Sequence, residues 1–386
     1  MLSRRSAVEA ITVQRGALSA WNVATLRHWR VATRSWCRTL SPWGMAAELS
    51  EAHGAYAELR RTVASAGLLE RAYSYYLWRT ALSFLLLAIG IALPFILVPS
   101  AHALVVAALA IAFGSIQVAL IGHDAGHLAI FKSARANWAL GSLCWSLSVG
   151  ISFWYWTDRH NRHHTVTNDT AADPDLQWAN VVAYSAEMVA ARPNRSSFLT
   201  RYQVILGPLY ALFLPFGFRV EGWQFTLSQL RGSRRITESS LMTLSTLAWL
   251  APVAVLSWWW LAVFLLSQIL AGLYLALAIA PNHKGMPTWP PGTTLSFLER
   301  QVLSSRNIAP NPFWDFVFGG LNYQIEHHLF PTMPRVNFSQ TRDVVKPFCA
   351  AHGLAYTEMG AFASYRLVIS ELRRVGRSAA ITGAAG

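Results

Sequence analysis

Two long stretches without a charged residue constrain the fold of this chain more than any other feature. No Asp, Glu, Lys or Arg occurs in residues 80–122, or again in residues 239–283. Each stretch is about twice the ~20 apolar residues that one helix needs to cross a bilayer. Backbone polar groups inside a bilayer must be satisfied within the chain, which favours helices. The sequence therefore predicts an all-α integral membrane protein.

Each uncharged stretch is long enough to form a helical hairpin. Pro94, Pro99 and Ser100 interrupt the first stretch, and a Ser-Trp-Trp-Trp run that begins at Ser257 interrupts the second. Proline disfavours a helix interior, and Trp collects at membrane interfaces. We therefore predict four transmembrane helices arranged as two hairpins, with interfacial helices and a cytoplasmic cap. The predicted spans lie near residues 80–98, 103–121, 241–257 and 261–280.

Two weaker apolar stretches lie between the hairpins, at residues 136–157 and 202–218. If only the first of them crossed the membrane, His160 and His123 would lie on opposite faces. A cluster of metal ligands cannot span a hydrocarbon core of about 30 Å. We therefore interpret both stretches as interfacial or re-entrant helices.

The composition and the charges agree with this topology. The chain is 53% hydrophobic and 13% charged, whereas about 25% of the residues in a soluble domain are charged. Arg79 and Arg235 precede the two hairpins, and the turns near Ser100 and Ser257 carry no Lys or Arg. By the positive-inside rule, both termini and the histidine motifs are expected in the cytoplasm. The net charge of +13 suits anionic lipid or an acidic partner protein, and no nucleic-acid partner is expected.

The predicted organisation has three segments. Residues 1–72 form a basic cytoplasmic lead-in, partly disordered or interfacial, and residues 73–345 form the membrane domain. Residues 346–386 form a cytoplasmic segment that we expect to be disordered after Arg374. Cys37, Cys144 and Cys349 have no paired spacing, which indicates neither a disulfide framework nor a cysteine metal site.

Eight of the twelve histidines fall in four short motifs, each beside a long apolar segment. A helix brings residues i, i+3 and i+4 to one face, so Gln324 and the histidines three and four residues later would point the same way. Imidazole is a good ligand for iron, copper and zinc, and one ion rarely takes more than about six ligands. The sequence therefore predicts at least two metal ions, bound by His123, His127, His160, His163, His164, His283, His327 and His328.

A pair of irons that activates dioxygen would need neutral donors, open positions and a dry surrounding, which a membrane-embedded histidine cluster supplies. Carboxylates behind the rings usually fix the imidazole tautomers. The acidic residues near enough in sequence are Asp124, Asp158, Asp173, Asp175 and Glu326.

Two other classes of protein fit less well. A membrane zinc hydrolase would need Glu where Asp124 stands in HDAGH, and three protein ligands to zinc would leave five histidines unexplained. A metal carrier or channel would place its polar ligands near the bilayer midplane, whereas these lie at the ends of the predicted spans.

The three motifs HDAGH, HNRHH and QIEHH, in this order on two membrane hairpins, resemble those of the membrane fatty acid desaturases. The wording QIEHHLFPTMPR is similar to the front-end and related acyl-lipid desaturases, in which Gln replaces the first His of the third motif. Asn168 and Asp173 after the second motif, and Asn282 before His283, match as well. The resemblance covers roughly residues 75–345.

The resemblance implies a di-iron enzyme with the eight histidines as ligands. It also implies that Gln324 occupies the position of a ninth ligand, where it would bind iron or hold a water, and that Asn282 holds a water near one iron. Family members use dioxygen to take two hydrogens from adjacent methylenes of a fatty acyl chain, which leaves a cis double bond. A hydroxylase or ketolase of the same superfamily remains the alternative.

Many relatives of this subgroup carry a fused cytochrome b5 domain marked by HPGG, and no HPGG occurs here. We therefore expect electrons from a separate carrier such as a ferredoxin with its reductase, and a bacterial cell membrane as the location. The acyl chain length, the double-bond position and the acyl carrier (lipid, CoA or carrier protein) stay open.

Overall fold

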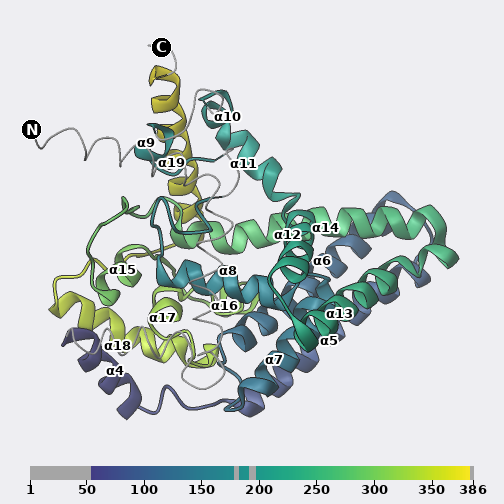
Figure 1. The fold of residues 1–386 in the computed structure, drawn as a ribbon, viewed down its shortest axis with the longest axis horizontal. Coiled ribbons are helices and arrows are strands. Elements are labelled where there is room, and N and C mark those ends of the chain that lie inside the picture. Colours follow the sequence, from purple (N-terminus) through teal and green to yellow (C-terminus); the bar gives the residue numbers. More distant parts are fainter. Residues whose placement is uncertain (1–53, 178–181, 191–196, 383–386) are drawn as a thin grey trace, which may run out of the picture. The chain divides into compact units, whose positions relative to one another are not determined.

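The computed structural model describes residues 54–177, 182–190 and 197–382, and these are mostly helical, with loops between the helices (Figure 1). Most of the predicted N-terminal lead-in lies outside the described residues. The described part also contains a parallel pair of two-residue strands, β1 (Asn307–Ile308) and β2 (Glu358–Met359).

Both helices of the first predicted hairpin are present. It consists of α5 (Tyr73–Ile96) and α6 (Ala101–Gly126), both long and apolar enough to cross a membrane. Ser100 caps α6 by accepting a hydrogen bond from the backbone N–H of Ala103. The two helices approach so closely that a Cβ at Gly114 would lie 2.5 Å from Cα of Leu87. A glycine is therefore required at this crossing.

The second hairpin differs from the prediction. Its second helix, α14 (Val253–His283), is a candidate span, but α13 (Gly232–Leu250) is not, so the span at 241–257 is not confirmed. Arg234, Arg235 and Glu238 lie in α13 and leave only its second half apolar. A first break lies at residues 251–252, because Pro252 cannot continue α13. Ser257 has a non-helical φ of 51° and ψ of −137°, and the chain bends there between two helical parts of α14, so the turn predicted near Ser257 is confirmed.

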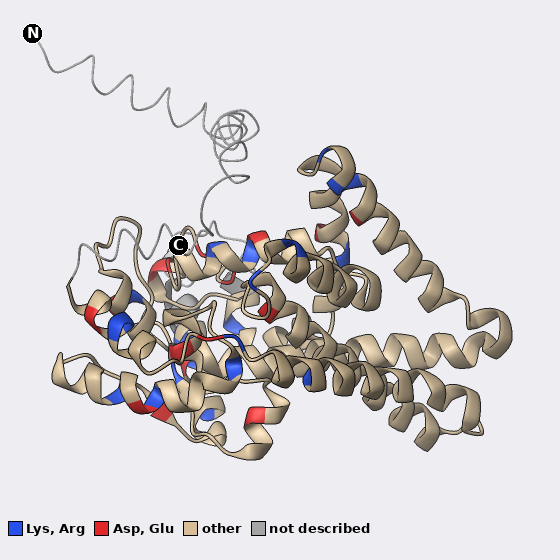
Figure 2. Ribbon diagram, turned by 90° about the horizontal axis from the view of Figure 1, so that it is seen from below, with Lys and Arg blue, Asp and Glu red and all other residues tan. Residues whose placement is uncertain are grey.

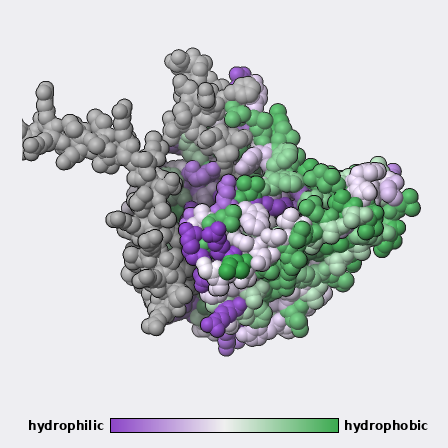
Figure 3. Space-filling view, turned by 45° about the vertical axis from the view of Figure 1, so that its right-hand side comes forward, coloured by the Kyte–Doolittle hydropathy of each residue, from purple (hydrophilic) through white to green (hydrophobic). Residues whose placement is uncertain are grey.

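The surface of these helices suits lipid. The long helices on the right of Figure 2 are almost free of charged residues, and the same region is green in Figure 3. Large apolar side chains stand exposed there, among them Ile96 and Val255, each 74% exposed. A bilayer would cover this apolar surface, as the composition led us to expect.

The two weaker apolar stretches form short, bent elements. The first contains α7 (Ala134–Ser142), a π-helical turn η1 (Leu143–Val149) and the start of α8 (Phe153–Thr165). The second contains α11 (Gln203–Ala211) and α12 (Leu214–Ser228), which bend by 64° and together form either a broken span or a re-entrant loop. Two shorter helices precede it, α9 (Ala186–Ala190) and α10 (Ser197–Arg201).

Helix α4 (Ala55–Ser65) and the short helices after α14 form a compact cap over the charged end of the molecule. Tyr56 of α4 donates its hydroxyl to the carbonyl of Leu329, and Leu59 and Val63 are fully buried beside it. The amphipathic α4 thus packs on protein, although we expected helices of this region on the membrane surface. The cap consists of α4 (Ala55–Ser65), α15 (Phe297–Leu303), α16 (Pro312–Val317), α17 (Gln324–Leu329), η4 (Arg335–Asn337) and α18 (Phe338–Ala351).

The expected disorder after Arg374 is wrong for most of the tail. Helix α19 (Ala361–Thr382) continues through it, and residues 383–386 lie outside the described part. Val375 is fully buried against Leu176 and Met188, so packing on the loop after α8 orders a segment whose composition alone suggested a flexible end.

Candidate metal centre

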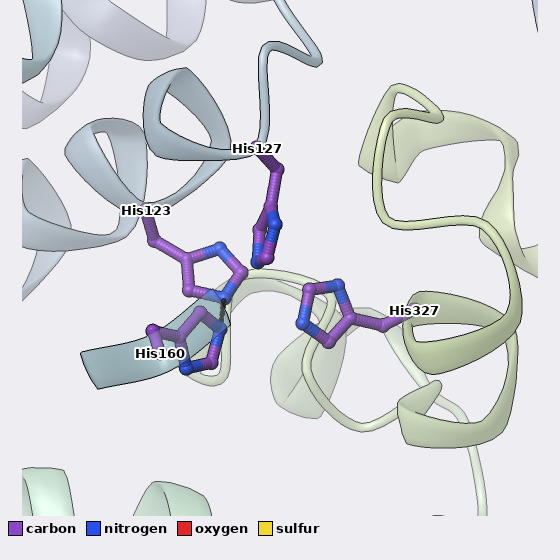
Figure 4. Close-up of side chains that lie close together, drawn as sticks. All are labelled: His123, His127, His160 and His327. Atoms are coloured by element: carbon purple, nitrogen blue, oxygen red, sulfur yellow. Dashed lines mark hydrogen bonds between the residues drawn. The ribbon is translucent and has the colours of Figure 1, made fainter. Parts of the chain in front are cut away.

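All eight predicted histidines converge between the membrane helices and the cap. His123 lies in the last turn of α6 and His127 directly follows it, while α8 supplies His160 and α17 supplies His327. Figure 4 shows the four rings turned toward one another. The Nε2 atoms of His123 and His160 are 3.1 Å apart. The stretch at 136–157 therefore returns the second motif to the first, as predicted.

A second group forms beside the first. His163, His283 and His328 each offer a nitrogen, and these nitrogens lie within 4.8 Å of one another. Nε2 of His163 is 3.3 Å from Nε2 of His283. His164 lies between the groups, since its Nε2 is 3.1 Å from Nε2 of His160 and its ring stacks on that of His328. Helix α17 thus serves both groups with adjacent residues.

Four of the histidines have a hydrogen-bond partner at Nδ1, on the side of the ring away from the cluster, so that Nε2 faces the cluster. Asp124 lies 3.0 Å from Nδ1 of His123, and Asp173 lies 3.0 Å from Nδ1 of His163. The carbonyl of Ser304 is 2.9 Å from Nδ1 of His283, and Oε1 of Gln301 is 2.8 Å from Nδ1 of His328. Such partners fix the tautomer and orientation of metal-binding histidines.

Burial keeps most of the cluster neutral. Burial first, and the neighbouring imidazoles second, hold the pKa values of His160, His164, His327 and His328 well below the usual value for histidine. Burial would also lower the pKa of His163, but Asp173 and Asp175 reverse this effect and raise it. Because a metal takes the neutral imidazole, the cluster needs little deprotonation to bind one.

The residues present fit a metal pair. Two imidazole nitrogens bound at right angles to one ion, each at about 2.1 Å, would lie about 3.0 Å apart. The spacings of 3.1 Å found here agree with that value. Nε2 of His327 and Nε2 of His328 are buried and have no hydrogen-bond partner within the described residues. A buried polar atom without a partner is costly, and a metal ion would satisfy both.

Gln324 faces the second group. Its Nε2 lies 2.8 Å from Nε2 of His283, and its Oε1 accepts a hydrogen bond of 3.0 Å from Asn282. Asn282 also donates to the carbonyl of Leu321. The two amides that the sequence singled out are therefore directly paired, at the nitrogen that His283 would offer to a metal.

A buried ionic network anchors α6 to the cap. Asp124 accepts hydrogen bonds from Arg335 and, at 2.6 Å, from the hydroxyl of Tyr76. Arg335 also donates to the carbonyl of Leu120. The carboxylate behind His123 is therefore held by residues from α5 and η4, both remote in the sequence.

Of the other predicted polar groups, Asp175 alone lies close to one of the eight histidines among the side-chain contacts of the described residues, and the rest bind neighbouring loops and side chains. Asp175 pairs with Arg159 at 3.1 Å and lies 3.8 Å from Nδ1 of His163. Asp158 pairs with Arg162, and Asn168 ties its loop to the carbonyls of Pro287 and Ser304. Glu326 accepts hydrogen bonds from Asn307 and Tyr356, and burial raises its pKa to about 7.

Sequence reasoning missed Gln301, Ser304, Tyr76 and the role of Arg335. Arg335 stands in the quoted motif QIEHHLFPTMPR, so its proximity to the site was available as a hint. No sequence motif marks Gln301 or Ser304. Gln is a common residue in helices, and Ser304 acts through its backbone carbonyl.

Two cavities adjoin the histidines. A smaller space of about 90 Å³ is walled in part by Trp145, Trp156 and Phe218. A wider one of about 320 Å³ lies between α11, α14 and α19. His163 and His283 line both cavities, so the second histidine group stands at their junction.

Comparison with known proteins places this geometry in context. The sequence model of the fatty acid desaturase family matches residues 99–360. Similar proteins include an acyl-lipid (9-3)-desaturase of Physcomitrium patens, 28% identical over 68% of this chain and 52% of the relative. A Delta(6)-fatty-acid desaturase of Caenorhabditis elegans is 25% identical over 83% of this chain and 74% of the relative.

A Delta 8-(E)-sphingolipid desaturase of Kluyveromyces lactis is 28% identical over 84% of this chain and 59% of the relative. The chain thus spans between about half and three quarters of the length of these relatives. They come from a moss, a nematode and a yeast, and so give no support to the bacterial source expected from the sequence.

Proposed function

Because the chain belongs to the fatty acid desaturase family, we propose that it is a membrane oxidoreductase that introduces a cis double bond into a fatty acyl chain, with dioxygen as oxidant. The observation that carries this proposal is the convergence on one cluster of eight histidines from α8, α14, α17 and the end of α6, including His127 directly after it. A site for a single metal ion would not need so many neutral nitrogen donors in one place.

We propose that two iron ions occupy the cluster. His123, His127, His160 and His327 would hold one ion, and His163, His283 and His328 the other, with His164 within reach of both groups. The pair would supply dioxygen reduction coupled to removal of two hydrogens from adjacent methylenes. In balance, dioxygen takes two electrons from the acyl chain and two from a donor, and leaves as two waters.

The surrounding residues of this chain would orient and protect that chemistry. Asp124, Asp173, Gln301 and the carbonyl of Ser304 hold the rings so that Nε2 points inward. Trp145, Trp156 and Phe218 form apolar walls that exclude water, which would otherwise quench an oxidising centre. Gln324 and Asn282 would line the open side of the second metal position, the one beside His283, where their amides can bind a metal or a water.

The substrate would be a fatty acyl chain carried by a lipid, CoA or carrier protein, and the carrier is left open. The two electrons would come from a separate protein, for which we propose a ferredoxin with its reductase. A net charge of +13 suits an acidic partner of this kind. The histidine cluster and both termini would lie on the cytoplasmic side of the membrane.

The test is expression in a host with simple lipids, followed by mass spectrometry of double-bond positions and by metal analysis of the purified protein. We expect new cis double bonds and close to two irons per chain. His164→Ala and His328→Ala should abolish the product and lower the iron content, while His352→Ala, at an exposed site remote from the cluster, should change neither. An oxygenated acyl chain as main product would instead assign hydroxylase or ketolase activity, and stoichiometric zinc without iron would refute the di-iron proposal.

A further inference from the structure

The wide cavity between α11, α14 and α19 has walls of hydrocarbon over most of its length. We call it the α11–α19 chamber. It is lined by Leu273 and Ala211 at the level where α11 passes beside Gly272, by Val204, Gly207 and Leu372 toward the other end of α11, and by His163 and His283 at the near end, where α14 ends. The polar lining residues that carry charge, Asp175 and Lys284, belong to the near end. The chamber is thus an apolar space with one reactive end.

The length of the chamber matches one acyl chain. It follows α14 from Leu273 to His283, and ten residues of helix span about 15 Å. A bilayer core of about 30 Å holds two leaflets, so one acyl chain occupies about 15 Å. The volume of about 320 Å³ lies at the lower end of the range found for small-molecule sites.

The position of the chamber relative to the membrane also favours a lipid chain. Helix α14 is a candidate span that ends at His283, so Lys284 marks the level at which apolar helix gives way to polar surroundings. The apolar residues Leu277 and Ile369 line the chamber and remain 44% and 40% exposed. A hydrocarbon chain can therefore enter from the bilayer without crossing water.

We propose that the α11–α19 chamber binds the part of the acyl chain on one side of the reacting carbons, and that Gly207 limits the length of chain accepted. This inference rests on the proposed desaturase function. A Cβ at Gly207 would lie 3.5 Å from Val182, another wall residue, so a methyl group fits and a longer side chain enters the chamber. Gly207 therefore leaves room that a larger residue would remove.

The variant Gly207→Leu tests the role of this wall. It should cut conversion of the longest accepted acyl chains about tenfold relative to shorter ones, as expected when a pocket loses room for a few methylenes. Gly217→Leu is the matched control, because it makes the same change in the neighbouring α12, where a Cβ meets no atom within 4 Å. Leu also has a higher helix propensity than Gly, so neither helix should be weakened.

Labelling of the wild-type protein tests occupancy without relying on any variant. Cells are fed fatty acids with a diazirine near either the carboxyl or the methyl end, and labelled peptides are identified after irradiation. At least one probe should label α11 or α19. Label confined to residues of the smaller cavity, such as Trp145 and Ile116, or an unchanged chain-length profile in Gly207→Leu, would overturn the inference.

The two proposals fail separately. Wild-type protein that makes no unsaturated product would refute the desaturase function, and labelling alone would then decide whether the chamber holds an acyl chain. Wild-type protein that desaturates normally, with no label in α11 or α19, would refute the chamber and leave the function intact.

Discussion

Gln301 holds His328 in place, with its Oε1 2.8 Å from Nδ1 of the imidazole. The same side chain donates through Nε2 to the carbonyl of His164 at 2.9 Å. One fully buried amide in α15 therefore ties the second histidine motif to the third. An amide is well suited to this position because it accepts from an imidazole N–H and donates to a carbonyl at once.

Gln301→Leu should weaken metal binding at the second histidine group by about 10- to 100-fold, the usual cost of losing the partner of a metal-binding histidine. Leucine has a similar size but no acceptor, so the tautomer of His328 is no longer fixed. Iron content after dialysis against graded chelator measures the effect. Gln301→Glu keeps an acceptor and should retain more iron, whereas equal loss in both variants would show that Gln301 acts only through packing.

Arg335→Met should destabilise the fold by about 3–5 kcal/mol, because it leaves the buried carboxylate of Asp124 without its cation. The control is Arg374→Met, which breaks an ion pair with Glu371 whose side chains are 62% and 28% exposed. That change should cost at most about 1 kcal/mol. Denaturant unfolding in detergent micelles compares the two, and equal losses would contradict a structural role for the buried pair.

Glu358 should make stability fall at acid pH. Glu358 accepts two hydrogen bonds from Arg342, at 2.5 and 2.7 Å, and this pair holds β2 against α18. These hydrogen bonds are the main reason why the pKa of Glu358 lies below its usual value of 4.5. A carboxyl whose folded pKa is lowered contributes stability above 4.5 that is lost as the pH falls. Unfolding midpoints at neutral and acid pH should therefore differ less in Glu358→Gln than in the wild type. The same pH slope in both proteins would show that this carboxylate does not contribute.

Reporter fusions test the orientation in the membrane. A reporter placed after Arg235 or after the last residue should report the cytoplasm, and one inserted at Ser100 should report the opposite side. The physical reason is the cluster of Arg before each hairpin and its absence from the turn between α5 and α6. If Arg235 and the C-terminus lay on opposite sides, α13 and α14 would not form a hairpin that crosses the membrane twice.

The sequence alone determined the features that depend on local composition and spacing. Absence of charge over residues 80–122 predicted the α5–α6 hairpin, because burial of backbone in lipid leaves a helix as the available form. The i, i+4 spacing of His123 and His127 placed both at one end of α6, facing the same cluster. Both inferences rest on one segment at a time.

The tertiary structure decided what depends on distant segments. Helix α13 is too polar in its first half to count as a span by itself, although the uncharged stretch that follows suggested one. The tail is helical because α19 has a partner in the loop after α8. The partners of His283 and His328 are a backbone carbonyl and an amide that only packing brings to Nδ1. Spacing along one helix sets which residues share a face, but the atom that lies behind each ring is set by how the cap closes over the membrane helices.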